Sequence, residues 1–393
     1  MRLMILALLL AGSVAEYYKW RPARYALGAY AVLAAFWGMR FGQGTDYFAY
    51  FYFYTQRSPG YGPHVEKIDA GFSALMELCQ RLGLSYYAFI FLIAALCTWL
   101  IYRFVRRFSP FMRLLPLFLF YAIYALPYME SGIRQCISMA LFLGIILDCK
   151  WKGRYICAVL TTVVAITIHA SASILLIVLF LPRHREPYER FFSKWGIASL
   201  VGFTVLCVLL NAVPPSVLLA MLPDSLSARL MPYVAASSFN ILALLNRALF
   251  MGIIYFLGWK KRHILDGRTY FLLVIYTLSA LIYVLFMRYA IMSRATAYSR
   301  IVEIGLIPTL LYYNKGLRPK ATRAGICAIA LFACFLFWKD EQASQLQGYY
   351  FRTDGVSYPY ITIWNKPALL EHNSGALYRI YSKTFDPHGK LLK

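Results

Sequence analysis

Three arginines stand at intervals of six residues in one short stretch of the chain: Arg288, Arg294 and Arg300. Guanidinium groups bind phosphate oxygens through paired hydrogen bonds, and they neutralise the charge that builds on a departing phosphate without a metal ion. This stretch is therefore predicted to hold a pyrophosphate group. In an alternative interpretation, Arg300 pairs with Glu303 and Arg288 extends toward the membrane surface. Arg294 is then the best of the three candidates for binding pyrophosphate.

A further arginine and a histidine add to this chemistry. Arg134 and Gln135 begin an apolar segment, so Arg134 must face a polar cavity or a partner, and it joins the predicted pyrophosphate site. Glu130 stands four residues earlier, and an ion pair with Arg134 is the simplest interpretation. His169 lies between apolar residues, where a neutral imidazole can accept a proton from a sugar hydroxyl, although a lone histidine is more often structural.

Acidic and aromatic residues gather in the segment 40–85. Asp46 precedes an aromatic run that begins with Tyr47, and Asp69 follows later. Carboxylates bind sugar hydroxyls and aromatic faces stack on sugar rings, so these residues, with Glu130 and Gln135, are predicted to contact a sugar. Asp46 also competes with His169 for the role of general base. An aromatic belt at the membrane interface explains the tyrosines equally well.

The scaffold for these groups is predicted to be an all-α, polytopic helical bundle in a membrane. The chain of 393 residues is 61% hydrophobic and only 15% charged, which is too apolar for an ordinary soluble domain. Asn246 and Arg247 form a polar pair inside one apolar segment, which makes Arg247 a further candidate for substrate binding. The predicted spans number about twelve: 3–15, 25–39, 86–102, 114–127, 134–149, 155–168, 170–182, 195–213, 241–259, 269–286, 301–313 and 324–338.

The basic residues predict the orientation of the spans. With both termini outside, 22 of the 40 Lys and Arg residues fall in six short inner connections, as the positive-inside rule requires: 16–24, 103–113, 150–154, 183–194, 260–268 and 314–323. The net charge of +23 is explained in this way, without nucleic acid. The segments on either side of His169 are predicted to form a hairpin with His169 at its outer tip. The first segment resembles a cleavable signal peptide, but cleavage would leave three basic residues outside, so a retained span is predicted.

Two regions follow from this topology. Residues 1–338 form the transmembrane domain, and residues 339–393 form an outward-facing tail, which is predicted to be a structural cover. The outer loops of the domain are 40–85, 214–240 and 287–300. The candidate groups lie on this outer side, so the active site is predicted to face away from the cytosol.

Several short segments resemble elements of the EpsG family, whose members are Wzy-like polysaccharide polymerases. The resemblance covers residues 30–180 closely and 290–360 loosely. The family usually has Glu where Asp69 stands. The segments are Gly44-Thr45-Asp46-Tyr47, Asp69-Ala70-Gly71-Phe72, Ile133-Arg134-Gln135, Ile168-His169-Ala170-Ser171, Arg294 to Pro308, and Ser357-Tyr358-Pro359-Tyr360.

The resemblance implies a metal-independent glycosyltransferase without cofactors in the bacterial cytoplasmic membrane. Its substrate would be an oligosaccharide repeat on undecaprenyl pyrophosphate, and its product an exopolysaccharide, capsule or O-antigen formed by block transfer. Membrane lipid, a chain-length regulator and a flippase are the other partners that it implies. Two alternatives stay open: a transporter that flips the lipid-linked oligosaccharide, and a ligase or acyltransferase that moves the glycan or an acyl group to another acceptor.

Overall fold

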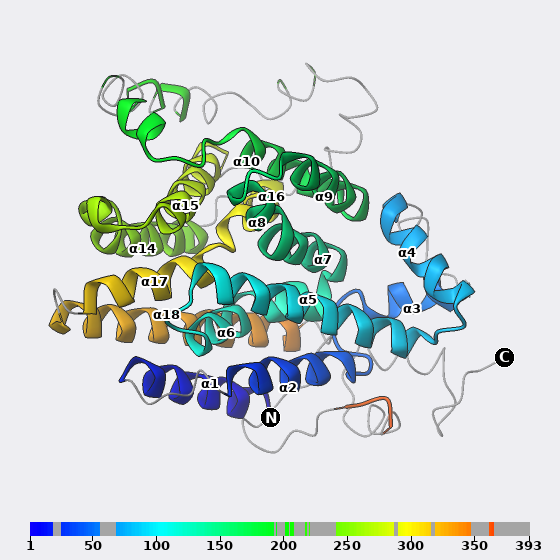
Figure 1. Ribbon diagram of the computed structural model, residues 1–393. Helices are drawn as coiled ribbons and strands as arrows, with labels where there is room; N and C mark the ends of the chain where they lie inside the picture. The colour runs from blue at the N-terminus through cyan, green and yellow to red at the C-terminus, as the bar shows by residue number, and fades with distance from the viewer. Residues whose placement is uncertain are drawn as a thin grey trace.

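A computed structural model of the chain contains helices throughout the parts that it describes (Figure 1). These parts are residues 1–18, 25–55, 68–191, 194, 201–203, 205–207, 217, 220, 241–286, 290–315, 319–346 and 361–364. Within them the all-α prediction is confirmed, and the β-structure is one isolated bridge between Arg40 and Thr362. The predicted span 195–213 and the predicted outer loop 214–240 lie almost entirely outside the described residues.

The helices of the first half match the predicted apolar segments closely and add two that were not predicted, α3 and α4. They are α1 (Arg2–Tyr17), α2 (Ala26–Gly38), α3 (Tyr47–Thr55), α4 (Ala70–Arg81), α5 (Tyr86–Phe108), α6 (Leu114–Phe120), the π-helix η3 (Tyr121–Ser131), α7 (Ile133–Leu141), the π-helix η4 (Phe142–Ile146), α8 (Leu147–Trp151), α9 (Tyr155–Ile168), the 3-10 helix η5 (Ala170–Leu175) and α10 (Leu176–Phe180).

The second half adds one unpredicted α-helix, α16, in the stretch that holds Arg294, and a short 3-10 helix, η6, in the predicted inner connection 260–268. Its helices are α14 (Ile241–Leu257), the 3-10 helix η6 (Trp259–Ile264), α15 (Gly267–Leu285), α16 (Ala290–Arg300), α17 (Glu303–Lys315) and α18 (Pro319–Leu346).

The structure supports a membrane protein but does not confirm twelve spans. Among the described residues, helices long and apolar enough to cross a bilayer cover Tyr86–Phe108, Leu114–Ser131, Gly267–Leu285 and Thr322–Ala343. Other apolar helices are shorter, including Ala26–Gly38 and Tyr155–Ile168. An α-helix rises about 1.5 Å per residue, so these shorter helices fall below the length of a roughly 30 Å hydrocarbon core.

Large apolar side chains cover parts of the outer surface, as lipid contact requires. On α5, Leu92, Leu96 and Trp99 are exposed, while Phe89, Ile93 and Cys97 are buried in the bundle. Exposed apolar residues recur on α9 and α18, where Ile156 and Leu331 are examples. A helix with apolar residues on both faces is expected where one face meets protein and the other meets lipid.

Hydrogen bonds gather residues of all six predicted inner connections at one end of the bundle. This arrangement was expected if the chain runs back and forth between two ends. The bonds are Arg113 N to Glu16 Oε1, Lys315 Nζ to Tyr17 O, Arg268 Nη1 to Arg107 O, Arg185 Nη1 to His263 O, and Arg183 Nη1 to Trp151 O.

The opposite end of the bundle carries most of the candidate residues. Helices α3 and α4 lie at this end, where α2 ends and α5 begins (Figure 1, right). The described part of the tail, 361–364, joins it through the bridge of Arg40 with Thr362 and a bond from Phe41 N to Ile361 O of 3.0 Å. This small part of the tail therefore covers the loop after α2, and most of the remaining tail lies outside the described residues.

Candidate active site

Asp69 is the centre of a cluster that joins three distant segments. Its Oδ2 atom lies 2.9 Å from Arg134 Nη1 at the start of α7, and 3.4 Å from His169 Nδ1 between α9 and η5. Asp69 caps the N-terminus of α4, but its side chain makes no capping bond, so its carboxylate is directed to these two partners instead. We call Asp69, Arg134 and His169 the Asp69 cluster.

A close helix contact holds the cluster together. Gly71 in the first turn of α4 packs against Thr167 in the last turn of α9, and a Cβ atom added at Gly71 would lie 2.4 Å from Thr167 Oγ1 and 2.7 Å from the Thr167 carbonyl carbon. Only glycine permits this approach. Helix α7 also packs against α9, because Ser138 Oγ donates to Ala165 O at 2.9 Å. Asp69, Arg134 and His169 are thereby fixed relative to one another.

Tyr50 links Asp46 to this cluster. Arg134 Nε donates to the Tyr50 hydroxyl at 3.0 Å, and that hydroxyl donates to Asp46 Oδ2 at 3.1 Å. The Arg134 guanidinium also lies over the Tyr50 ring, 5.7 Å from its centre. Burial, followed by the charge of Asp46, raises the pKa of Tyr50, so the hydroxyl stays protonated and can donate. The two candidate bases are thus linked to Arg134 through different residues, Asp46 through Tyr50 and His169 through Asp69.

The cluster is partly open, and some of its atoms remain available. The side chains of Asp69, Arg134 and His169 are 24, 24 and 25% exposed. Within the described residues, His169 Nε2 and Arg134 Nη2 have no hydrogen-bond partner. Burial, and then the charge of Arg134, lowers the pKa of His169 below its ordinary value of 6.5, while Asp69 opposes this shift. The imidazole is therefore neutral at neutral pH, as a general base must be.

Helix α16 contributes the next predicted residues. Gln135 Nε2 donates to the Arg294 carbonyl oxygen at 2.9 Å, so the start of α7 lies against this part of α16. The Arg294 side chain is exposed and has no ion pair within the described ranges. Tyr298, one turn later, lies 6.4 Å from His169 between ring centres, and its hydroxyl accepts a bond from Ser171 Oγ at 3.4 Å. Arg294 is thus an unpaired cation beside the cluster.

Arg300 and Arg247 lie in a second, buried cluster instead. Arg300 Nε lies 3.1 Å from Glu303 Oε1, so the two residues form the pair that the alternative interpretation predicted. Glu303 is fully buried. Tyr124 also donates to Glu303 at 2.8 Å. Arg247 lies over the Tyr283 ring at 4.2 Å. We call Arg300, Glu303, Tyr124 and Arg247 the Glu303 cluster. Arg288 and the Asn246 side chain lie outside the described residues.

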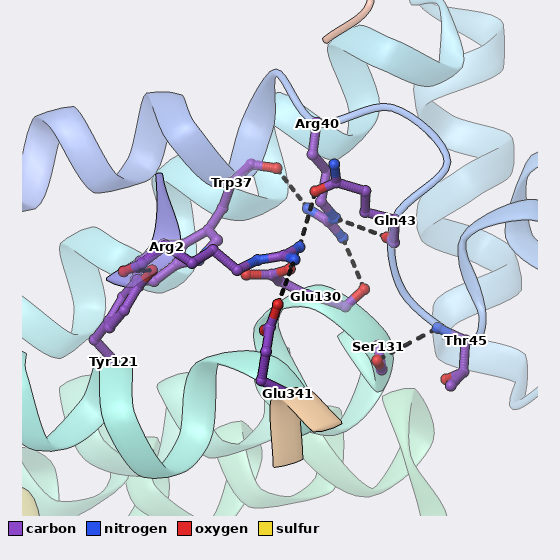
Figure 2. A network of polar contacts seen from close by, with 9 residues as sticks. All are labelled: Arg2, Trp37, Arg40, Gln43, Thr45, Tyr121, Glu130, Ser131 and Glu341. Atoms are coloured by element: carbon purple, nitrogen blue, oxygen red, sulfur yellow. Dashed lines mark hydrogen bonds and ion pairs between the residues drawn. The ribbon is translucent and has the colours of Figure 1, made fainter. Parts of the chain in front are cut away.

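Glu130 does not pair with Arg134, so the simplest interpretation of their spacing is wrong. Glu130 Oε2 lies 2.8 Å from Arg2 Nη2, and Arg2 also binds Gln43 and Glu341 at 2.9 and 3.4 Å (Figure 2). The helix breaks at Gly132, whose ψ angle is 61°, so a spacing of four residues no longer brings side chains to one face. Glu130 is 1% exposed and ties η3 to Arg2 of α1, and Arg2 in turn joins Glu341 of α18.

This network also shapes the Gly44–Tyr47 loop. Gly44 has a φ angle of 105°, and a Cβ atom there would lie 2.0 Å from the Glu130 carbonyl oxygen. Thr45 N donates to Ser131 Oγ at 3.4 Å, which Figure 2 also shows. Tyr47 is fully buried between aromatic rings, including those of Phe41 and Tyr86, so its side chain serves the packing of α3 rather than an open site.

Three residues that make contacts around the candidate site were not identified as candidates from the sequence: Tyr50, Tyr298 and Arg2. The first two had a signal, because Tyr50 lies four residues after Asp46 and Tyr298 four residues after Arg294, which is one helical turn. Arg2 gave no such signal, because its partners are remote in sequence. In the described part of the chain, no group of three or more His, Cys, Asp or Glu side chains is arranged to hold a metal ion.

The comparison with protein families agrees with the sequence motifs. The EpsG family model matches residues 24–351, so the chain belongs to the EpsG family, as its motifs predicted. This membership indicates a membrane protein of polysaccharide biosynthesis, a glycosyltransferase-like polymerase that acts on a lipid-linked sugar. No match to the chain was found among curated proteins or among solved structures.

Proposed function

We propose that the protein polymerises oligosaccharide repeat units carried on undecaprenyl pyrophosphate, by block transfer at the Asp69 cluster. One observation carries the proposal. A single carboxylate oxygen contacts both Arg134 and His169, from segments 65 and 100 residues away, at a position that is partly open. Ionisable groups in a membrane protein are costly, and a cluster that leaves donor and acceptor atoms available is typical of a substrate site.

His169 is the general base in this proposal. Asp69 accepts a hydrogen bond from Nδ1, which directs the lone pair of Nε2 toward the substrate. The hydroxyl of the non-reducing sugar on one lipid-linked repeat transfers its proton to Nε2 as its oxygen attacks the anomeric carbon of the donor. The bond from that carbon to the pyrophosphate oxygen breaks, and the pyrophosphate leaves with the electron pair. Asp46 is the alternative base, since the Tyr50 hydroxyl links it to Arg134.

Arg294 and Arg134 stabilise the departing pyrophosphate. Arg294 has an exposed side chain without an ion pair among the described residues, and Arg134 retains Nη2 as a donor. In the proposal these guanidinium groups balance the charge that develops on the leaving oxygens, and the step uses no metal ion. Gln135 holds the Arg294 backbone against α7 and thus sets the separation of the two cations.

The site faces away from the cytosol in this proposal. Residues of all six basic connections meet at the opposite end of the bundle, and basic connections stay on the cytoplasmic side. An impermeant thiol reagent tests this orientation in a cysteine-free background. In intact cells it should label Arg81→Cys at the end of α4 and spare Arg268→Cys at the start of α15; the reverse pattern would overturn the orientation.

Elongation by purified protein in detergent tests the proposed activity. Lipid-linked repeats should become a ladder of longer glycans that remain on the lipid carrier, and His169→Gln should abolish the ladder. Arg81→Gln is the matched control, because Arg81 is an exposed charge on the helix that Asp69 begins. Activity that requires a sealed bilayer would indicate a flippase, and transfer of the glycan to another acceptor would indicate a ligase. Either result would refute the proposal.

A further inference from the structure

At the end of the bundle opposite the Asp69 cluster, one buried carboxylate meets three cations. Asp148 Oδ2 on α8 lies 3.3 Å from Arg103 Nη2 and 3.4 Å from Lys152 Nζ, and it also pairs with Arg107 Nη1. Three positive charges against one negative charge leave an excess of two. We call these four residues the Asp148 cluster.

Further cations increase this excess. Arg268 Nη1 donates to the Arg107 carbonyl oxygen at 3.2 Å, which brings a fourth cation to the cluster. Arg106 lies near enough to Arg107, and Arg154 near enough to Lys152, for charge repulsion. Like charges at such distances destabilise one another, most strongly beside a low-dielectric region. An anion bound here would therefore relieve repulsion that the protein alone leaves in place.

The cluster can offer bonds to such an anion. The side chains of Arg103, Arg107 and Lys152 are 31, 33 and 41% exposed, whereas that of Asp148 is 7% exposed. The carboxylate thus lies behind the cations, and the cations present donors to the surface.

The face of α5 that leads to the cluster is apolar. Leu92, Leu96, Trp99 and Arg103 follow at intervals of three or four residues, so they share one helix face, and the first three are exposed. The Arg103 guanidinium lies over the Trp99 ring, 5.7 Å from its centre. From the middle of α5 to its C-terminal end, the side chains on this face change from aliphatic to aromatic to cationic. A membrane lipid has the same order, because its apolar acyl chain leads to a polar headgroup.

We propose that the Asp148 cluster binds the phosphate headgroup of an anionic phospholipid, with an acyl chain along Leu92, Leu96 and Trp99. Basic pockets between membrane helices bind anionic headgroups in this way. The apolar path favours a lipid over a soluble anion. The excess charge favours an anionic lipid over a zwitterionic one, because a zwitterionic headgroup has no net charge to offer. This site is independent of the proposed polymerase activity.

Native mass spectrometry of the full-length protein, with phosphatidylglycerol or phosphatidylcholine added, tests the site. Wild type should bind phosphatidylglycerol more tightly. The variant Arg103→Gln/Lys152→Gln keeps the Arg107–Asp148 pair, and it should bind phosphatidylglycerol roughly 30-fold more weakly, the loss expected for two basic residues near an anionic surface. The control Arg262→Gln/Arg323→Gln removes the same charge from two exposed positions near this end of the bundle and should bind like wild type.

Three results would overturn the assignment: no preference for phosphatidylglycerol, an equal loss in the control variant, or displacement of the lipid by millimolar inorganic phosphate but not by chloride at the same ionic strength. A second measurement needs no change in the cluster itself. Brominated phosphatidylglycerol should quench part of the tryptophan fluorescence of wild type, and Trp99→Phe should remove that part. Equal quenching in both proteins would place the lipid elsewhere.

Discussion

The Asp69 cluster and the Glu303 cluster contain the same kind of ion pair in two different settings. The Arg134–Asp69 pair is 24% exposed on both sides, whereas Arg300 and Glu303 are 10 and 0% exposed. Glu303 accepts hydrogen bonds from Arg300 and Tyr124. Asp69 shares one oxygen between Arg134 and His169, and Arg134 Nη2 and His169 Nε2 have no partner among the described residues. Side-chain exposure and unused hydrogen-bonding atoms, rather than residue type, therefore distinguish a candidate active site from a structural ion pair.

The largest expected effect is on stability, at the buried pair. Arg300→Ala leaves Glu303 without its guanidinium, and breaking a buried pair costs about 3–5 kcal/mol. The protein should lose its fold at a clearly lower temperature, measured by heating in detergent followed by size-exclusion chromatography. Arg300→Met with Glu303→Gln removes both charges and should regain most of the loss. A stable Arg300→Ala variant that elongates no glycan would instead place Arg300 in the active site.

The next effect is on rate, at the open site. Arg294→Ala should lower kcat by about 10² to 10³, the cost of removing one group that stabilises transition-state charge. Its thermal denaturation temperature should stay at the wild-type value, because the side chain is exposed and makes no ion pair in the described parts of the chain. If Arg294→Ala lowered the denaturation temperature as well as kcat, Arg294 would be a structural residue, and the contrast between an open active site and a buried ion pair would fail.

A smaller effect is expected where α4 meets α9. Gly71→Ala forces the helices apart, because the new methyl group meets Thr167 backbone and side chain at less than 3 Å. Overpacking costs about 1–3 kcal/mol of stability. Because the change also moves Asp69 away from His169, the elongation rate should fall by about tenfold or more. Gly28→Ala is the matched control, because no atom lies within 4 Å of its added methyl group. Equal activity of both variants would show that the α4–α9 contact does not position the site.

The smallest effect is a shift of the pH profile. Neutral His169 is the active form, and burial and Arg134 lower its pKa below 6.5, so kcat/KM should be constant above that pH and fall on acidification. Asp69 raises this pKa, so Asp69→Asn should move the acid limb to still lower pH. An acid limb that moves upward, or not at all, would assign the titration to another group.

The sequence predicted the members of the open site better than it predicted their contacts. Arg134 and His169 were identified because a polar group inside or beside an apolar segment must face a cavity or a partner. Their common partner Asp69 was a candidate, but nothing local in the sequence indicates a contact across 65 or 100 residues. The spacing of Glu130 and Arg134 was misleading because Gly132 breaks the helix between them.

The helices show the same limit. The predicted apolar segment 155–168 has the bounds of α9, and the segment 86–102 begins with α5, which continues to Phe108. Such segments are predictable because lipid and protein contact both demand apolar side chains. Helices α3, α4 and α16 were not predicted, because all three are short and their packing against larger helices stabilises them. Polar residues also interrupt α4 and α16, whereas α3 is almost entirely aromatic. The partner of Arg2 was equally hidden, because it depends on how α1 lies against η3 and α18.

A double-mutant cycle in the elongation assay tests most directly whether Asp69 and His169 act as one site. kcat/KM is measured for wild type, Asp69→Asn, His169→Gln and the double variant. Because Asp69 works through the His169 imidazole in this account, the double variant should be no slower than the slower single variant, within about threefold. Losses that multiply would show that the two residues act independently and would contradict the account.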